Sequence, residues 1–423
     1  MEPGWDRGRG GRVETIGSIG LRDLTSELVW PALFRAVPLA LQPSRVIVSF
    51  LFVAFTGSWL TLVGSVTGAG SSVAHAWSRA REPWLHAWGA APTALSQPDW
   101  MRTAGAAIWE LFVGVPVMMI REEPLAVLLA APVLALLWCV AGAALARMSA
   151  EDMAKGILTP WPRGVAFGLA RARSSLGALL AMPMVVWLIV AVLAAGGWVL
   201  LRWPVLNLGG GVLYGLTLAG GLLAATVGTA FVLTHAMLIP AVSCEGTDAM
   251  DAVQRCFAYL VNRPGRLVAY ALVLLAQGVL LHAALSWIVG GGAYLAAAAA
   301  GAWAGPRGSE AADPLRLLVT NAPAAEGTFA ATTWLTHAWT TALAMVFMSV
   351  LVSFYHAAGT VLYLLMRRVN DGQEPSDLWF PGMIEGTMAE SLRGTGERLT
   401  TEGNSGTTAS AQSPAPDEIE DRA

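Results

Sequence analysis

Six stretches of the chain contain no acidic or basic residue, and each is longer than the ~20 apolar residues that an α-helix needs to cross a bilayer. These stretches lie between Arg45 and Arg79, Glu123 and Arg147, Arg173 and Arg202, Arg202 and Glu245, Arg266 and Arg307, and Glu326 and Arg367. Charged residues make up 13% of the chain, against roughly 25% in soluble domains. Because lipid offers no partner to exposed backbone amides, each stretch is expected to be helical.

The predicted fold class is therefore an all-α, polytopic transmembrane helix bundle with six spans and additional interfacial amphipathic helices. The expected spans are 46–65, 124–147, 176–201, 210–239, 267–290 and 334–366. Residues 1–45 are predicted to form a cytoplasmic segment with a short interfacial helix within 20–42, and residues 46–366 the transmembrane domain. Residues 367–423 are predicted to be a cytoplasmic, largely disordered tail, since from about 384 few large apolar residues remain.

The distribution of lysine and arginine predicts the orientation. With the N-terminus inside, the inner segments carry 19 of the 26 basic residues and the outer segments carry 7. Basic residues favour the cytoplasmic side of a membrane. Twelve of the 18 tryptophans then fall at or near the outer face, where indole rings favour the membrane–water interface. We therefore expect a protein of the bacterial cytoplasmic (inner) membrane with both termini in the cytoplasm.

One further apolar stretch, 104–120, could be counted as a seventh span. It contains Glu110 and Pro116, and only Arg121, Glu122 and Glu123 separate it from the next span. Counting it would also move the basic segment 147–173 to the outer side, against the positive-inside rule. An interfacial or re-entrant helix is the favoured interpretation.

The two inner segments in the middle of the chain resemble each other in design, which suggests a pseudo-repeat. In each, a short polar sequence follows a span and precedes a predicted short amphipathic helix, basic residues and the next span. In the second segment Thr247 is a candidate N-cap and Pro264 ends the helix. Its apolar face is predicted to contain Met250, Val253, Phe257 and Leu260. We expect this helix to lie on the membrane or against the bundle.

The same segments carry a resemblance to known sequences. Residues 148–154 and the stretch Ile239–Phe257, with its Pro240, Glu-Gly-Thr-Asp and Ala-x-x-Arg-x-Phe elements, resemble uncharacterised multi-pass membrane proteins of planctomycete-type bacteria. That similarity covers about residues 20–380, with Cys256 where serine is usual. The paired units are also loosely similar to the membrane domain preceding some glycerophosphodiester phosphodiesterases, whose soluble domain is missing from this sequence. The resemblance implies an architecture and no activity.

Sequence motifs that would carry catalysis are missing. There is no His-Glu-x-x-His zinc site, and the single lysine, Lys155, is not part of a phosphate-binding loop. Neither an enzymatic activity nor a metal site is expected. The net charge of −3 argues against a nucleic-acid partner. Cys139, Cys244 and Cys256 are too few for a disulfide framework.

Four histidines lie in or at the ends of predicted spans, namely His235, His282, His337 and His356. The predicted topology places His282 and His337 toward the outer side and His235 and His356 toward the inner side. Two pairs at two depths would suit a di-haem helical bundle, and intramembrane ionisable groups often handle protons or metals. However, no span carries both ligands at the regular spacing of such bundles, and all four residues lie near interfaces. A structural role is favoured and no cofactor is expected; haem, metal or proton handling are the alternatives.

Three classes of function follow. The first is a non-enzymatic scaffold that contacts the lipid bilayer and binds protein partners through its cytoplasmic amphipathic segments and acidic tail, whose net charge is −5 from Glu385 onward. The second is a lipid-handling or transporter-like protein, because internal repeats are common in carriers. Small residues recur at four-residue spacing in 210–239, namely Gly211, Gly215 and Ala219, and Gly220, Ala224 and Gly228; they favour close helix packing. The third is a histidine-based haem or metal protein.

Overall fold

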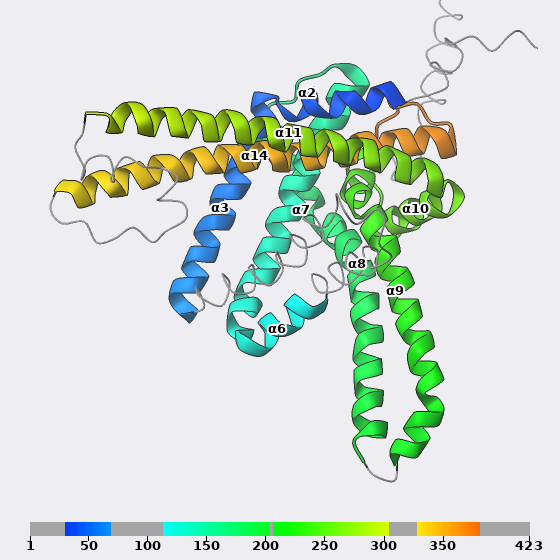
Figure 1. The fold of residues 1–423 in the computed structure, drawn as a ribbon. Helices are drawn as coiled ribbons and strands as arrows, with labels where there is room; N and C mark the ends of the chain where they lie inside the picture. The colour runs from blue at the N-terminus through cyan, green and yellow to red at the C-terminus, as the bar shows by residue number, and fades with distance from the viewer. Residues whose placement is uncertain (1–29, 69–112, 204–205, 304–327, 381–423) are drawn as a thin grey trace, which may run out of the picture.

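The computed structural model describes residues 30–68, 113–203, 206–303 and 328–380 (Figure 1). It is 91% helical and has no strand in these ranges. The six long helices are α3 (Pro43–Thr67), α7 (Pro124–Lys155), α8 (Trp161–Leu201), α9 (Leu206–Glu245), α11 (Pro264–Gly301) and α14 (Thr328–Asp371). The shorter ones are η1 (Trp30–Arg35), α2 (Ala36–Ala40), α6 (Val115–Glu122) and α10 (Ala249–Asn262). The predicted all-α helix bundle is confirmed.

Each predicted span lies inside one long helix, and all six helices are long and apolar enough to cross a membrane. The chain is therefore a multi-pass membrane protein. Four of the helices begin with proline in the first turn, where its fixed φ favours the helix and its missing N–H is not needed. α3, α7, α9 and α14 are each followed by a glycine with φ between 64° and 73°, a backbone conformation that residues with a Cβ rarely adopt.

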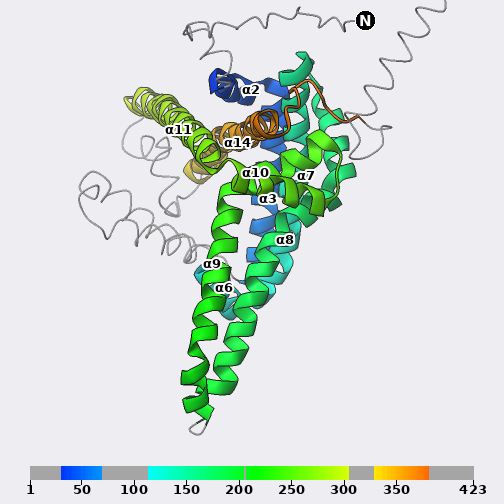
Figure 2. The same ribbon diagram turned by 90° about the vertical axis from the view of Figure 1, so that its right-hand side faces the viewer.

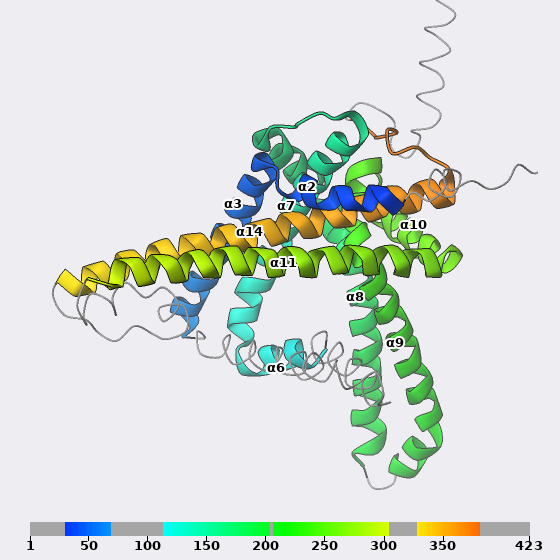
Figure 3. The same cartoon turned by 45° about the horizontal axis from the view of Figure 1, so that its top comes forward.

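Four of the six long helices form two hairpins, and the two hairpins run crosswise to each other. α8 pairs with α9, and α11 lies alongside α14, as Figures 1 and 3 show from two directions. Figure 2 views the α11–α14 pair nearly along its length, while α8 and α9 stay in the plane of the picture. α3 and α7 pack between them, against α14 and α8. At 1.5 Å per residue the 41 residues of α8 extend about 60 Å, roughly twice the hydrocarbon thickness.

The hydrophobic core lies where the two hairpins meet. Its largest cluster joins Leu33 of η1, Leu238 of α9, Leu267 of α11 and Leu364 of α14, all at most 1% exposed. Elsewhere backbones approach closely at glycine: a Cβ at Gly359 of α14 would overlap the backbone of α9. Such contacts suit a membrane interior, where helices associate by packing rather than by excluding water.

Away from this core the hairpins expose apolar side chains. Val212 on α9 is 81% exposed and Trp287 on α11 is 84% exposed. In the most apolar stretch of α8 only 11% of the residues are buried inside the protein. In water such a surface would be costly, and in a bilayer it is the expected lipid-facing surface.

The predicted amphipathic helix of the second inner segment is α10, which packs against α9 and α8. Two details of the prediction are wrong. The N-cap is Asp248, whose side chain accepts a hydrogen bond from the Asp251 backbone N–H at 2.9 Å. The buried residues are Ala252, Val253, Cys256 and Tyr259. Of the predicted face, Val253 is buried and Leu260 packs partly buried against the core, whereas Met250 and Phe257 point outward. Met250 is 57% exposed and Phe257 is 38% exposed.

The first inner segment contains no separate amphipathic helix. α7 continues to Lys155, residues 156–160 connect, and α8 begins at Trp161. Arg147, Glu151 and Asp152, which suggested the end of the span, form ion pairs at the end of α7. The helix therefore continues through them. The prediction of a helix there is wrong.

Three other predicted segments are partly described. α6 covers the end of 104–120; residues 104–112 lie outside the described ranges, so an interfacial or re-entrant helix there stays a prediction. Within 20–42, η1 and α2 contribute to the core. Residues 367–371 complete α14, residues 372–380 fold back, and the rest of the predicted tail lies outside the described ranges.

Candidate functional site

Charged side chains that are buried in protein gather at one end of the molecule. The first residues of α3 and α8 and the last residues of α7, α9 and α14 meet there, and we call this region the polar end. Arg45, Arg147, Glu245 and Arg367 are each at most 3% exposed. Burying a charge is costly unless it is paired and hydrogen-bonded, so the partners of these four residues determine what the region can do.

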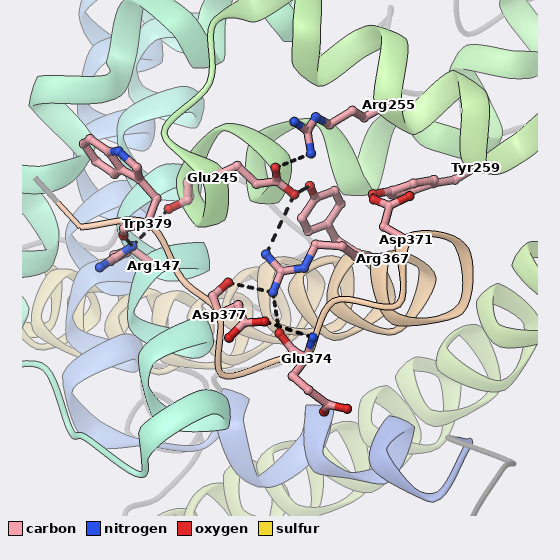
Figure 4. A network of polar contacts seen from close by, with 11 residues as sticks. Arg147, Glu245, Arg255, Tyr259, Arg367, Asp371, Glu374, Asp377 and Trp379 are labelled. Atoms are coloured by element: carbon pink, nitrogen blue, oxygen red, sulfur yellow. Dashed lines mark hydrogen bonds and ion pairs between the residues drawn. The ribbon is translucent and has the colours of Figure 1, made fainter. Parts of the chain in front are cut away.

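Glu245 is the centre of the largest network (Figure 4). It is the last residue of α9, where the negative end of the helix dipole disfavours a carboxylate. The Tyr363 hydroxyl donates to it from α14 and Arg255 pairs with it from α10. Nη1 of Arg367 lies 3.8 Å from Oε1 of Glu245. Two cations and one hydroxyl therefore offset both the burial and the dipole.

Arg367 also fixes the chain that follows α14. Its Nη2 donates to the backbone carbonyls of Glu374 and Asp377, both at 2.8 Å. Gly372, with φ of 68°, lets the chain reverse directly after the helix. We call residues 373–380 the C-terminal strap. Its path back across the polar end is set by a buried guanidinium.

Further along the strap, Trp379 is held by α7 and α9. Its backbone N–H donates to the carbonyl of Cys244 at 2.9 Å, and its own carbonyl accepts from Nη1 of Arg147. Its indole ring covers Gly246, where an added Cβ would overlap the ring. Since Gly246 also has φ of 64°, glycine is required there for both backbone conformation and space.

Cations surround the two aromatic rings at the end of the strap. The Arg171 guanidinium lies 4.3 Å from the centre of a Trp379 ring. Phe380 is contacted by Arg147 at 4.7 Å and by Lys155 at 4.0 Å. Such cation–π contacts contribute about 0.5–2 kcal/mol each, with the larger values away from water.

A second group of ion pairs joins α3 to α7. Nη2 of Arg45 lies 2.5 Å from a carboxylate oxygen of Asp152, which also accepts from Gln42 at 2.6 Å. Within α7, Nε of Arg147 pairs with Glu151 at 2.6 Å. Removing one member of a buried pair of this kind costs about 3–5 kcal/mol. The pairs therefore hold the helix ends in one arrangement.

The two reactive side chains of α10 are kept protonated. Burial raises the pKa of the Tyr259 phenol, and the Asp371 carboxylate, which accepts its hydrogen bond, raises it further. Burial, with a smaller contribution from Glu245, raises the pKa of the Cys256 thiol. A protonated thiol is a poor nucleophile. All three cysteines are buried and free.

This chemistry is structural in character. The carboxylates of Asp152, Glu151 and Glu245 are engaged by arginine, and Asp371 is engaged by Tyr259. In the described part of the chain no group of three or more His, Cys, Asp or Glu side chains could hold a metal ion. The polar end is a set of mutually neutralised charges that ties the helix ends and the strap together.

The four candidate histidines lie in two different settings. His235 and His356 both contact Tyr355, with ring centres 5.9 and 5.0 Å away. His356 is 2% exposed and also packs on Trp138 at 4.7 Å. His282 and His337 are exposed, and His282 lies edge-on to Phe347 at 5.4 Å. The inner pair is thus brought together around one aromatic ring, which supports packing roles. Haem, metal and proton handling, the alternatives to a structural role, stay untested.

The network was not found by sequence reasoning, although one signal was present. Arginines at the edges of charge-free stretches are normally solvated, so the sequence pattern indicates Arg45, Arg147 and Arg367 only as span boundaries. The signal was Glu245, an acidic residue on the last turn of a helix directly before glycine, where the helix dipole makes it unfavourable without a cation nearby.

Comparison with known proteins adds nothing to this geometry, because no protein family, curated protein or solved structure matches the chain.

Proposed function

We propose that this protein is a non-enzymatic membrane scaffold that holds an acidic C-terminal segment at the membrane surface for binding by a protein partner. The observation that carries this proposal is the strap. Three buried groups, Arg367, Arg147 and the Cys244 carbonyl, hold residues 373–380 on the polar end. Residues 381–423 continue from that fixed point and carry a net charge of −5 from Glu385 onward.

The character of the polar end supports a scaffold over an enzyme. Its buried charges are used to neutralise one another, and the Cys256 and Tyr259 side chains have pKa values raised by burial. A general acid or base needs a pKa near the working pH and access to substrate. An anchoring role needs only stability, and paired buried charges with specific geometry supply it.

We further propose that the protein lies in the bacterial inner membrane with the polar end in the cytoplasm. The helix ends that gather at the polar end are the N-termini of α3 and α8 and the C-termini of α7, α9 and α14, and α11 begins directly after α10, which packs against α8 and α9. This alternation is what six spans with a cytoplasmic N-terminus require. The excess of basic residues in the same segments, 19 of 26, supports the same orientation.

Lipid handling is the second candidate function. A groove of about 490 Å³ lies between α8 and α9, on the part of the hairpin with the most exposed apolar side chains. The scaffold is preferred because the groove lies apart from the polar end, where the buried charged side chains hold the strap.

Site-specific photo-cross-linking in cells tests the scaffold proposal. A photoreactive amino acid at Leu399 in the acidic segment is expected to yield one discrete protein adduct, and the same amino acid at Leu216, which is 70% exposed on α9, is expected to yield none. The partner protein identified from this adduct, once purified, should bind the full chain and should not bind a chain that ends at Phe380. Absence of an adduct from Leu399, or equal binding to both chains, would contradict the proposal.

A further inference from the structure

The groove between α8 and α9 is lined by residues from 188–201 and 210–220. Figure 1 shows that these parts of the two helices lie away from the polar end. Twelve of its fourteen lining residues are glycine or aliphatic, and the other two are Tyr214 and Thr217. Leu188 and Leu216 at its borders are 64% and 70% exposed, so the groove opens on the lipid-facing surface. Its lining is suited to a hydrocarbon chain.

Glycines keep the groove open. Gly196 and Gly197 line it from α8, and a Cβ added at either would meet no atom within 4 Å. The two predicted small-residue rows of α9 differ in whether they contact α8. Gly220 packs on Leu193 of α8, whereas Gly211 and Gly215 face open space outside the groove lining. The row that contains Gly220 therefore packs against α8, and the row that contains Gly211 and Gly215 does not.

A single charge accompanies this apolar surface. Arg202 is the only acidic or basic residue between Arg173 and Glu245. It directly follows Leu201, which lines the groove, and its guanidinium lies 5.9 Å from a ring centre of Trp198. Trp198 and Trp203 beside it are more than half exposed, the position that tryptophan favours at a membrane interface. The groove therefore has a hydrocarbon-like body and a cationic end at headgroup level.

We propose that this groove binds one anionic phospholipid, with an acyl chain between α8 and α9 and the phosphate at Arg202. Arginine is well suited to phosphate because its planar fork can donate two parallel hydrogen bonds. A second copy of the chain is a poorer occupant, because residues 174–244 contain no acidic side chain to face Arg202. This inference does not depend on the scaffold proposal.

Native mass spectrometry of the full chain in detergent micelles containing either phosphatidylglycerol or phosphatidylcholine tests the inference. The wild-type chain is expected to retain one phosphatidylglycerol. Gly196→Leu fills the groove and should abolish retention. Gly211→Leu adds the same side chain on the neighbouring helix, outside the groove and with equal space, and should retain the lipid like the wild-type chain.

The charge is tested separately. Arg202→Gln should lower the retention of phosphatidylglycerol about tenfold, which corresponds to the loss of one charge-assisted hydrogen bond to its phosphate. Equal lipid retention by the Gly196→Leu and wild-type chains would overturn the proposal, as would a wild-type chain without lipid. A wild-type dimer that Gly196→Leu converts to a monomer would also overturn it and assign the groove to a second copy. Retention of free inorganic phosphate in place of lipid would overturn it too.

Discussion

Glu245→Gln replaces a buried carboxylate by a neutral side chain of nearly the same shape. The amide oxygen can still accept from the Tyr363 hydroxyl, but Arg367, which is 0% exposed, loses the carboxylate that lies 3.8 Å from its guanidinium. Arg255 loses its partner as well, yet at 31% exposure water can solvate its guanidinium. The substitution therefore isolates the cost of one uncompensated buried charge.

Breaking a buried ion pair costs about 3–5 kcal/mol, and the lower value applies here because the hydrogen bond from Tyr363 is retained. A loss of about 3 kcal/mol is a large part of the 5–15 kcal/mol that separates folded from unfolded states of typical proteins. Replacing Arg367 by methionine in the same chain removes the stranded cation. The double variant should be less destabilised than the sum of the single variants by about 1–3 kcal/mol.

The free energy of unfolding can be followed by urea titration in detergent, with limited proteolysis of residues 373–380 as a local readout. The matched control is Glu374→Gln, which breaks an exposed pair with Arg368 at 3.5 Å and should cost less than about 1 kcal/mol. If Glu245→Gln costs no more than Glu374→Gln, or if the effects of Glu245→Gln and Arg367→Met are additive, the buried network does not hold the polar end together.

Three further predictions concern separate features. Because burial and Glu245 raise the pKa of the Cys256 thiol, this thiol should resist maleimide at neutral pH in the folded chain. Its labelling should increase as the pH rises, and it should increase at neutral pH in the Glu245→Gln variant. Mass spectrometry of the labelled peptide measures both changes. Gly246→Ala should destabilise the chain by about 1–3 kcal/mol in the same urea titration, and more than Gly68→Ala, where φ is also positive but a Cβ meets no atom within 4 Å. Reporter fusions after Gly156 should be active in the cytoplasm and those near Trp88 outside it, and a reversed pattern would contradict the orientation.

The six long helices could be predicted because lipid imposes a simple requirement on sequence: about twenty residues without charge. Their ends could not, because charges that normally mark the edge of a span are here paired inside the protein. Arg45 and Asp152 are 107 residues apart and Glu245 and Tyr363 are 118 apart. No local pattern distinguishes such an arginine from a solvated one.

The buried face of α10 shows a second limit. Periodicity correctly indicated an amphipathic helix, and it assigned Met250 and Phe257 to the inward face because they are large and apolar. In water that assignment would hold. Beside a membrane, large apolar residues can face lipid, and the inward face combines the predicted Val253 with Ala252, Cys256 and Tyr259. Hydrophobicity alone therefore does not give the direction of burial near a bilayer.

The spacing of these contacts along the sequence also has a consequence for biosynthesis. Arg147 donates to the carbonyl of Trp379, which lies 232 residues later in the chain. The partners of Glu245 on the last helix, Tyr363 and Arg367, are also synthesised long after it. While the ribosome is still making α11, the end of α9 can contact Arg147 and Arg255 but not yet Arg367. The polar end can form all of its contacts only after Phe380 has been synthesised, so in a nascent or prematurely terminated chain the ends of α7 and α9 lack their partners from α14 and the strap.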